Sequence, residues 1–298
     1  MKRFLLLFAA VLSASAAMAQ TTITSADSLA FINADWNISY GDNGAEVKSA
    51  VIPMFGGHQS VFVISYPIAT YETAIIVGEG FGKDIPLTVD KRGLANHSDI
   101  TSALGKASGA EYAINGNYFN MKTRYLTCYT RLRGGYQSTP TSPSELNRVN
   151  GAIGIRRGGK KLVITEGCNP KKHYPVMMAG PVLILDGEDF QYDVDKMNPK
   201  YVSNFYSKRH PRTIVGYTGK GGRKDRVCMI VIDGRVPGKA DGASIPECTA
   251  ISRYLGLSNS LNLDGGGSTT IWSEDHGVLN HPSDYGEERI VPTVLIAR

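Results

Sequence analysis

The pattern of apolar and polar residues along the chain predicts more strands than helices. Residues 151–155 and 161–165 alternate on either side of a glycine-rich turn and predict a hairpin. Other short apolar runs have the length and β-branched content of strands. They lie at residues 61–65, 72–77, 182–185, 213–217, 226–232 and 291–297. We therefore expect an α+β fold with a mixed, mostly antiparallel β-sheet core and a few covering helices.

One helix is predicted between Ser244 and Gly256. Ser244 and Glu247 form a capping box with Pro246 in the first turn, and Gly256 is a typical stop residue. Apolar residues follow at helical spacing and indicate one buried face. Glu247 therefore has two interpretations. Its carboxylate satisfies the helix N-terminus, or it belongs to a functional site.

The stretch from Leu261 to Ile271 predicts a strand, a tight turn and a second strand. Asp264 follows the first strand, three successive glycines come next, and a β-branched run follows them. Because glycine has no Cβ atom, a ligand can approach the backbone N–H groups of such a turn closely. Asn262, Asp264 and Ser268 would then cluster beside amide donors. The alternative is a plain hairpin turn, since Asp-Gly is a common turn signal.

Polar residues also mark the ends of other predicted strands. Asn115, Gly116 and Asn117 follow a short buried run, Asp233 ends the run 226–232, and Arg212 precedes the run 213–217. Side chains at such positions often contact ligands, because the strands hold them on a rigid scaffold. Asn-Gly is equally a turn signal, so a purely structural role for residues 115–117 stays open.

Residues 121–150 lack a clear period and are rich in Thr, Ser, Pro, Tyr and Arg. Arg124, Arg131 and Arg133 are interleaved with tyrosines, a combination that suits sugar stacking and anion pairing. A stretch of this length inside a compact domain is typical of a functional loop or lid. A solvated loop that happens to be aromatic is the alternative.

The N-terminus predicts export. A basic start and an apolar run are followed by small residues ending at Ala19, which is typical of a secretory signal peptide cleaved at about Ala19/Gln20. We expect the mature protein to be periplasmic or extracellular, and the rest of the chain has no apolar run long enough to cross a bilayer. The chain then divides into a signal peptide at 1–19, an N-terminal extension of unknown role at 20–70 and a main domain at 71–298.

Composition argues against several functions. The formal net charge is only +5 and no Lys/Arg block resembles a binding tail, so nucleic acid is not an expected partner. In an exported chain the four cysteines could form disulfides, with Cys128 and Cys168 the preferred pair, whereas Cys228 and Cys248 look like buried thiols. No C-x-x-C pair or H-E-x-x-H motif indicates zinc. The sequence requires no cofactor and leaves a divalent cation open.

Short motifs follow one another in a specific order between about Tyr112 and Arg298. They are Asn115–Phe119, Ala179–Ile184, His210–Thr213, Ile232–Gly234 with Gly242–Glu247, Asn262–Thr270, and Val278–Asn280 with Pro282. This order resembles the phosphodiester glycosidase family. The resemblance implies that residues 71–298 form a hydrolase that cleaves the C1–O bond of a sugar-1-phosphodiester, of the N-acetylglucosamine-1-phosphodiester type, releasing free sugar and a phosphate monoester.

C1–O cleavage needs a carboxylate near C1 and cationic or amide donors for the departing phosphate. We expect Asp264, Asp233 and then Glu247 as catalytic carboxylates, and Arg212 as the phosphate clamp. The expected substrate-binding residues are Asn115, Gly116, Asn117, Asn262, Gly265, Gly266, Gly267, Ser268 and Asn280. The partner would be a small-molecule or glycan sugar phosphate. Alternatives are a metal-dependent phosphodiesterase that cuts P–O, and a non-catalytic cell-surface protein that binds glycans or sugar phosphates.

Overall fold

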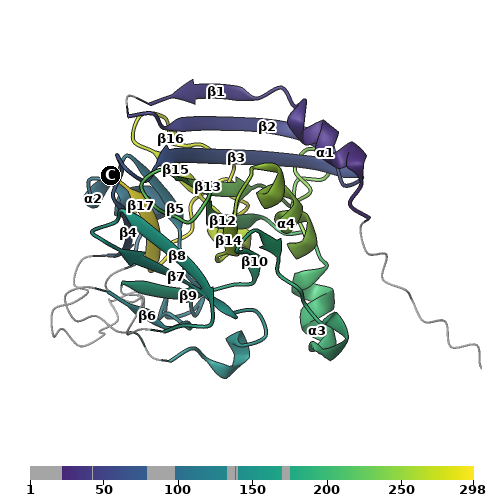
Figure 1. The fold of residues 1–298 in the computed structure, drawn as a ribbon. Helices are drawn as coiled ribbons and strands as arrows, with labels where there is room; N and C mark the ends of the chain where they lie inside the picture. The colour runs from purple at the N-terminus through teal and green to yellow at the C-terminus, as the bar shows by residue number, and fades with distance from the viewer. Residues whose placement is uncertain (1–21, 42, 79–97, 133–137, 139, 170–174) are drawn as a thin grey trace, which may run out of the picture.

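The computed structural model describes residues 22–41, 43–78, 98–132, 138, 140–169 and 175–298. Strands outnumber helices in this part of the chain, and they form an eight-stranded, a five-stranded and a four-stranded sheet (Figure 1). Neighbouring strands run antiparallel, as in the long pairs β2–β3 and β12–β13. The expected α+β fold with mostly antiparallel strands is confirmed. The predicted signal peptide lies outside the described residues.

The eight-stranded sheet joins the N-terminal strands to the strands that end near the predicted site. The register of β3 with β13 runs from Val61↔Ile232 to Pro67↔Arg226. Three strands of the predicted N-terminal extension thus belong to the main sheet, and the domain boundary at residue 70 stays a prediction. The order is β1 (Asn37–Tyr40), β2 (Glu46–Met54), β3 (Gly57–Pro67), β13 (Arg226–Ile232), β12 (Arg212–Tyr217), β14 (Asn259–Asn262), β10 (Val182–Leu185) and β11 (Glu188–Asp189).

Two smaller sheets complete the β structure. The predicted hairpin of residues 151–165 is confirmed as the pair β7–β8. The five-stranded sheet has the order β16 (Gly277–Val278), β15 (Ile271–Ser273), β5 (Tyr112–Asn115), β17 (Thr293–Ala297) and β4 (Thr73–Val77). The four-stranded sheet has the order β6 (Thr130–Arg131), β9 (Val176–Ala179), β7 (Gly151–Arg156) and β8 (Lys161–Glu166).

The helices are few and short. The predicted capping box opens α4: the Ser244 hydroxyl accepts a hydrogen bond from the Glu247 amide at 3.4 Å, and the Glu247 carboxylate accepts one from the Ser244 amide at 2.8 Å. A π-helical segment continues α3. The α-helices are α1 (Ser25–Ile32), α2 (Thr101–Ala107), α3 (Pro199–Tyr201) and α4 (Ile245–Tyr254); the other helical turns are η1 (Pro143–Glu145), η2 (Val194–Lys196), η3 (Val202–Tyr206) and η4 (Gly266–Ser268).

The largest core lies among the three sheets, because each of them contributes buried apolar residues to one cluster, including Ile64, Ile114 and Ile153. A second cluster packs α1 and α4 on the other face of the eight-stranded sheet, and a third packs α2 on the five-stranded sheet. Strand β13 alternates between the first two clusters, as the period of a strand requires. Val227, Met229 and Val231 face the first cluster, and Cys228, Ile230 and Ile232 face the second.

The four cysteines are free thiols, so the preferred pair Cys128–Cys168 does not occur in the structure. The expectation rested on a polar, loop-like sequence around Cys128. Tertiary packing instead buries Cys128 completely against Tyr118 and Val149. Cys228 and Cys248 are buried, as expected. Within the described residues no helix is both long and apolar enough to span a membrane.

Candidate functional site

The polar strand ends that the sequence singled out meet at one edge of the eight-stranded sheet. Arg212 at the start of β12 pairs with Ile232 at the end of β13, and Ile214 pairs with Asn262 at the end of β14. Since neighbouring strands run antiparallel, the start of β12 and the ends of β13 and β14 coincide. Asp233 follows the end of β13 directly, and Asp264 lies two residues beyond the end of β14.

Asn115 and Gly116 join this edge to the five-stranded sheet. The Asn115 amide donates to the Asp264 carbonyl at 2.7 Å, and its oxygen accepts from the Thr213 hydroxyl at 2.7 Å and the Thr270 amide at 3.1 Å. The carbonyl of Gly116 accepts from the Asp264 amide at 3.0 Å. A Cβ atom at Gly116 would lie 2.5 Å from the Thr293 hydroxyl, so only glycine fits. These contacts hold the backbone of Asp264 in place.

The carboxyl of Asp264 is partly buried beside the glycine turn. Burial raises the pKa of this carboxyl to about 6, and a hydrogen bond from Ser268 and the positive charges of Arg148 and Arg289 offset part of that rise. The amide of Gly265 also donates to Oδ1 of Asp264 at 3.0 Å. A carboxyl with such a pKa exchanges a proton near neutral pH, as acid–base catalysis requires.

Arg212 is a charged side chain in the interior, with only 1% of its surface exposed. Its Nε atom donates to the Ala243 carbonyl at 2.7 Å, and Nη2 donates to the carbonyls of Phe205 and Lys208 at 2.6 and 3.0 Å. No carboxylate among the described residues forms a salt bridge with it. Burial lowers the pKa of Arg212, yet a guanidinium stays charged in proteins. A buried charge without a counter-ion indicates an anion-binding position.

Arg148 is a second, partly exposed cation in the same cluster, and sequence reasoning missed it. Its guanidinium stacks on the rings of Tyr118 at 4.2 Å and Phe205 at 5.5 Å, while Arg212 stacks on Phe205 at 4.6 Å. The Nε atom of Arg148 pairs with Glu145 at 2.5 Å. Arg148 follows η1 inside the aperiodic 121–150 stretch. The only sequence signal was the Tyr and Arg content of that stretch.

Two buried polar atoms in this cluster have no hydrogen-bond partner among the described residues: Oδ1 of Asn262 and the hydroxyl of Tyr201. The amide nitrogen of Asn262 faces the Tyr118 hydroxyl and the carbonyls of Gly180 and Leu263 at 2.7 to 3.0 Å. These carbonyls fix the orientation of the Asn262 amide, so its oxygen is the atom left free. Buried acceptors without partners are rare in proteins and indicate a place where a ligand donates.

The backbone amides of the glycine turn are partly engaged within the protein. The Gly265 amide donates to Asp264, and the Gly266 amide donates to the Pro211 carbonyl at 2.9 Å. The Ser268 hydroxyl, in contrast, links Asp264 to Arg289, whose Nη1 atom donates to it at 3.3 Å. Side chains therefore supply much of the positive potential at this turn.

The remaining predicted residues make mainly structural contacts. Asp233 accepts from the Asn280 amide at 2.8 Å and the His281 backbone at 2.9 Å, and burial raises its pKa. Asn117 donates to the Thr130 hydroxyl at 3.0 Å and accepts from the Tyr118 amide at 2.8 Å. Glu247 is fully buried and pairs with Arg209 at 2.7 Å. The polar side-chain atoms of Asp233, Asn280, Asn117 and Glu247 are thus engaged within the protein.

A cavity of about 400 Å³ opens beside the arginine cluster. Arg148, Glu145, Tyr201 and Phe205 contribute to its wall, and Lys200 and Asn198 extend it toward the surface. Tyr201 and Phe205 stack at a centroid distance of 5.3 Å. This lining combines aromatic surface with cations and amides, which suits a small polar ligand.

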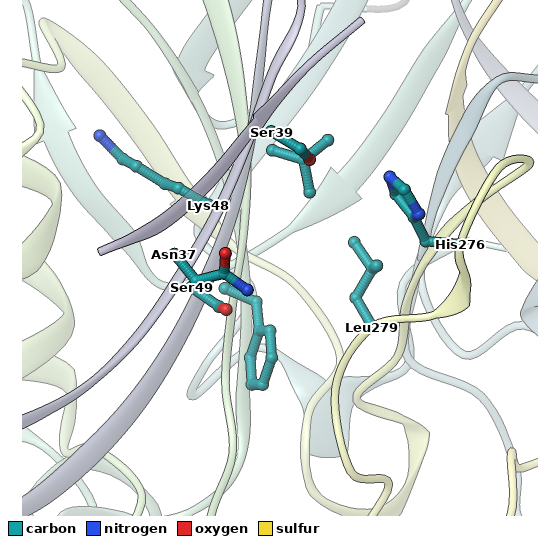
Figure 2. A pocket seen from close by; sticks show the side chains of 8 residues that line it. Asn37, Ser39, Lys48, Ser49, His276 and Leu279 are labelled. Atoms are coloured by element: carbon teal, nitrogen blue, oxygen red, sulfur yellow. The ribbon is translucent and has the colours of Figure 1, made fainter. Parts of the chain in front are cut away.

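Another cavity of about 400 Å³ lies far from these residues in the fold. Figure 2 shows Asn37, Ser39, Lys48 and Ser49 of the N-terminal strands on one side, and His276 and Leu279 on the other. Lys48 pairs with Glu46 at 3.2 Å and covers the Trp36 ring. None of the predicted site residues lines either cavity. We place the candidate site at the arginine cluster because Phe205, in the wall of the first cavity, stacks on both Arg148 and the predicted Arg212. No group of three or more His, Cys, Asp or Glu side chains suited to a metal occurs in the described ranges.

Three solved structures are similar in fold. The catalytic domain of zebrafish N-acetylglucosamine-1-phosphodiester alpha-N-acetylglucosaminidase, auto-inhibited by its pro-peptide, matches with a TM-score of 0.61 and 17% identity over 89% of this chain and 81% of that one. A hypothetical protein from Synechocystis matches with a TM-score of 0.60 and 14% identity over 88% of this chain and 63% of that one. A Burkholderia pseudomallei protein described as exported matches with a TM-score of 0.52 and 14% identity over 81% of this chain and 74% of that one. No curated protein matches the sequence significantly.

The family comparison covers all the strands and turns that build the arginine cluster and the Asp264 turn. The model of the phosphodiester glycosidase family matches residues 108–298, which is more than half of the chain. This range begins just before β5 and includes Arg148, Arg212 and Asp264. The protein belongs to the phosphodiester glycosidase family.

Proposed function

We propose that the protein hydrolyses the C1–O bond of a sugar-1-phosphodiester, of the N-acetylglucosamine-1-phosphodiester type, and releases the free sugar and a phosphate monoester. Family membership supports a glycosidase-type hydrolase. The observation that carries the proposal is Arg212, a buried cation without a carboxylate partner among the described residues, at the strand edge that also bears Asp264.

Arg148 and Arg212 bind the phosphate in this proposal. Phe205 stacks against both guanidinium groups, and Glu145 neutralises one of the two charges. The remaining positive charge matches the single negative charge of a phosphodiester. When the C1–O bond breaks, its electron pair moves to the phosphate oxygen and a second negative charge develops there. Fixed guanidinium donors stabilise that charge, because they are in place before the bond breaks.

Asp264 accepts the proton of the attacking water, whose oxygen forms the new bond to C1. The carboxyl is mostly ionised above its pKa of about 6 and remains basic enough to take a proton. Its charge also stabilises the positive charge that develops on the sugar ring. Glu247 ranks below Asp264 because it is fully buried in a salt bridge with Arg209. Asp233 ranks below it because both of its carboxylate oxygens accept hydrogen bonds, from Asn280 and from the His281 backbone.

Asn262 and Tyr201 contact the substrate through their unpartnered atoms. A hydroxyl or an acetamido N–H of the sugar donates to Oδ1 of Asn262, and a phosphate oxygen accepts from the Tyr201 hydroxyl. Burial raises the pKa of Tyr201, so this hydroxyl keeps its proton and remains a donor.

Hydrolysis of UDP-N-acetylglucosamine in ¹⁸O-water tests the bond that is cleaved. We expect the label in N-acetylglucosamine and none in the nucleotide, with and without a chelator. If the label instead appears in the phosphate, and the chelator abolishes hydrolysis, the protein is the metal-dependent phosphodiesterase. Binding of the nucleotide sugar without turnover would favour the non-catalytic alternative.

Replacing Arg148 by methionine tests the phosphate site. We expect kcat/KM to fall about 10²- to 10³-fold, the typical loss for one well-placed anion donor. The matched control is Arg156→Met, which removes an exposed arginine at the end of β7. Thermal melting shows whether each variant is folded. A folded Arg148→Met protein with the turnover of the control would remove Arg148 from the site.

A further inference from the structure

A second arginine pair, Arg124 and Arg289, lies near the glycine turn and has no part in the proposed phosphate site. Both guanidinium groups contact the sulfur of Met121, at 3.7 Å from Arg124 and 3.5 Å from Arg289. Arg289 also donates to the Ser268 hydroxyl at 3.3 Å, and Ser268 hydrogen-bonds to Asp264. Ser268 therefore connects Arg289 to the proposed catalytic carboxyl of Asp264.

Only Arg289 of this pair has a salt-bridge partner among the described residues. Arg289 forms a salt bridge with Asp284 at 2.6 Å. Arg124 stacks on the ring of Phe119 at 5.2 Å and donates to the carbonyl of Met121, but none of the described residues accepts from its buried Nε atom. Asp284 and the nearby Asp264 balance the charge of Arg289, whereas Arg124 has no salt bridge among the described residues and keeps one buried donor unsatisfied. Such a donor indicates that a ligand oxygen completes the cluster.

The two arginine pairs approach Asp264 from different sides. Arg148 stacks on Tyr118, whereas Arg124 stacks on the next residue, Phe119. Tyr118 packs in the cluster of Cys128 and Val149, while Phe119 packs in the cluster of α2 and β17. Consecutive side chains of an extended segment point in opposite directions, which separates the two guanidinium groups.

We propose that Arg124 and Arg289 bind a carboxylate carried by the sugar, so that the preferred substrate is the phosphodiester of an acidic sugar. This inference rests on the proposed function. With the phosphate at Arg148 and Arg212 and C1 at Asp264, the side of Arg124 and Arg289 faces the sugar. The single positive charge of Arg124, which lacks a salt bridge among the described residues, matches a carboxylate better than a phosphate monoester, which carries about −1.5 to −2 at neutral pH.

UDP-glucuronate and UDP-glucose test the inference, because they share a leaving group and differ by one carboxylate. With the intact protein we expect kcat/KM to be about 10- to 100-fold higher for UDP-glucuronate, the range expected for charge-assisted hydrogen bonds. Arg124→Met should remove most of this preference and change turnover of UDP-glucose less than about threefold. The control is Lys122→Met, which removes the same charge from an exposed residue of the same turn and should keep the preference.

The outcomes separate the two proposals. Turnover of both compounds at equal kcat/KM would overturn the carboxylate site and leave the proposed hydrolysis intact. If folded Arg124→Met loses kcat/KM equally for both compounds, the carboxylate site is also overturned, because Arg124 would then have a structural role only. If neither compound is hydrolysed, the proposed function fails for these sugars. Calorimetric titration with glucuronate and glucose then decides on the site, and glucuronate binding that is no stronger than glucose binding would overturn it.

Discussion

Asp264 shows how a functional group acts against the stability of its own fold at the residue scale. Burial disfavours the charged carboxylate, and the nearby arginines and Ser268 compensate only in part. The backbone contacts from Asn115 and Gly116 hold the residue in this position. Groups at active sites commonly lower stability in this way, because the fold maintains an environment that chemistry needs.

Asp264→Asn should lose activity and gain stability at neutral pH. The pKa of Asp264 is about 6 in the folded protein, above the ordinary value near 4 in the unfolded chain. The folded state thus binds the proton more tightly, and its contribution to stability is present below about pH 4 and lost as pH rises through 6. The uncharged variant should be about 1–2 kcal/mol more stable than the parent at pH 7.5.

Thermal melts of both proteins at pH 7.5 and 4.5 measure this difference. We expect the melting temperature of Asp264→Asn to exceed that of the parent by a few degrees at pH 7.5. This difference should shrink at pH 4.5, where the parent carboxyl is largely protonated. Turnover should fall at least 10²-fold at pH 7.5, and by a smaller factor at pH 4.5, where the protonated parent carboxyl no longer accepts the proton of water. A large loss of stability in Asp264→Asn at pH 7.5 would indicate that the carboxylate is chiefly a turn-forming group.

The sequence pattern found Asp264, Asn262 and Arg212 because each ends or begins a strand. It missed Arg148 and Tyr201, which lie in segments without a clear period. Each reaches the site by a contact between residues far apart in the chain, such as the stacking of Arg148 on Phe205. Local patterns carry no information about such contacts.

At the element scale, the N-terminus of α4 was the most predictable feature. The capping box needs only the local residues Ser244 and Glu247, so it is visible in the sequence. The partner of Glu247 was not visible, because Arg209 lies 38 residues away and reaches it through the tertiary fold. The short α3 and η3 segments were not predicted at all, and they carry Tyr201 and Phe205 into the site.

Glu247→Gln tests whether this glutamate belongs to the helix or to the reaction. We expect a loss of about 2–3 kcal/mol in stability, since the change leaves Arg209 partly buried without its carboxylate partner. The kcat of the folded protein should stay within about threefold of the parent, because no proposed catalytic contact is lost. Urea unfolding and steady-state kinetics give the two values. A 10²-fold loss of kcat in a variant with unchanged unfolding would instead place Glu247 among the catalytic groups.

For the whole molecule, the N-terminal strands are part of the main sheet. Strand β13 pairs with β3 along the full length of β13, and β1 and β2 extend the same sheet outward (Figure 1). Ile64 and Tyr66 of β3 are fully buried in the central cluster, while Val61 and Val63 pack beneath α1 and α4. The family match begins only at residue 108, yet the core of the matched region includes these strands.

A chain that starts at residue 71 should therefore fail to fold. Removing the N-terminal strands exposes β13 as an edge strand. It also removes buried aliphatic and aromatic side chains, each of which contributes about 1.5–3 kcal/mol to the stability of a marginally stable fold. Circular dichroism melting and limited proteolysis measure the outcome, with residues 22–298 as the control. A cooperative melt of the 71–298 chain would show that the N-terminal strands form a separable unit.

Taken alone, the sequence determined the α+β class, most strands, the capped helix and the polar strand ends that carry Asp264 and Arg212. These features depend on local periodicity, capping and turn chemistry, which short segments encode. Only the tertiary structure decided that the N-terminal strands join the main sheet, that Cys128 is buried, and that Arg148 and Arg289 face Asp264 from different segments. Those outcomes depend on which distant segments pack together, and burial and charge pairing follow from that packing.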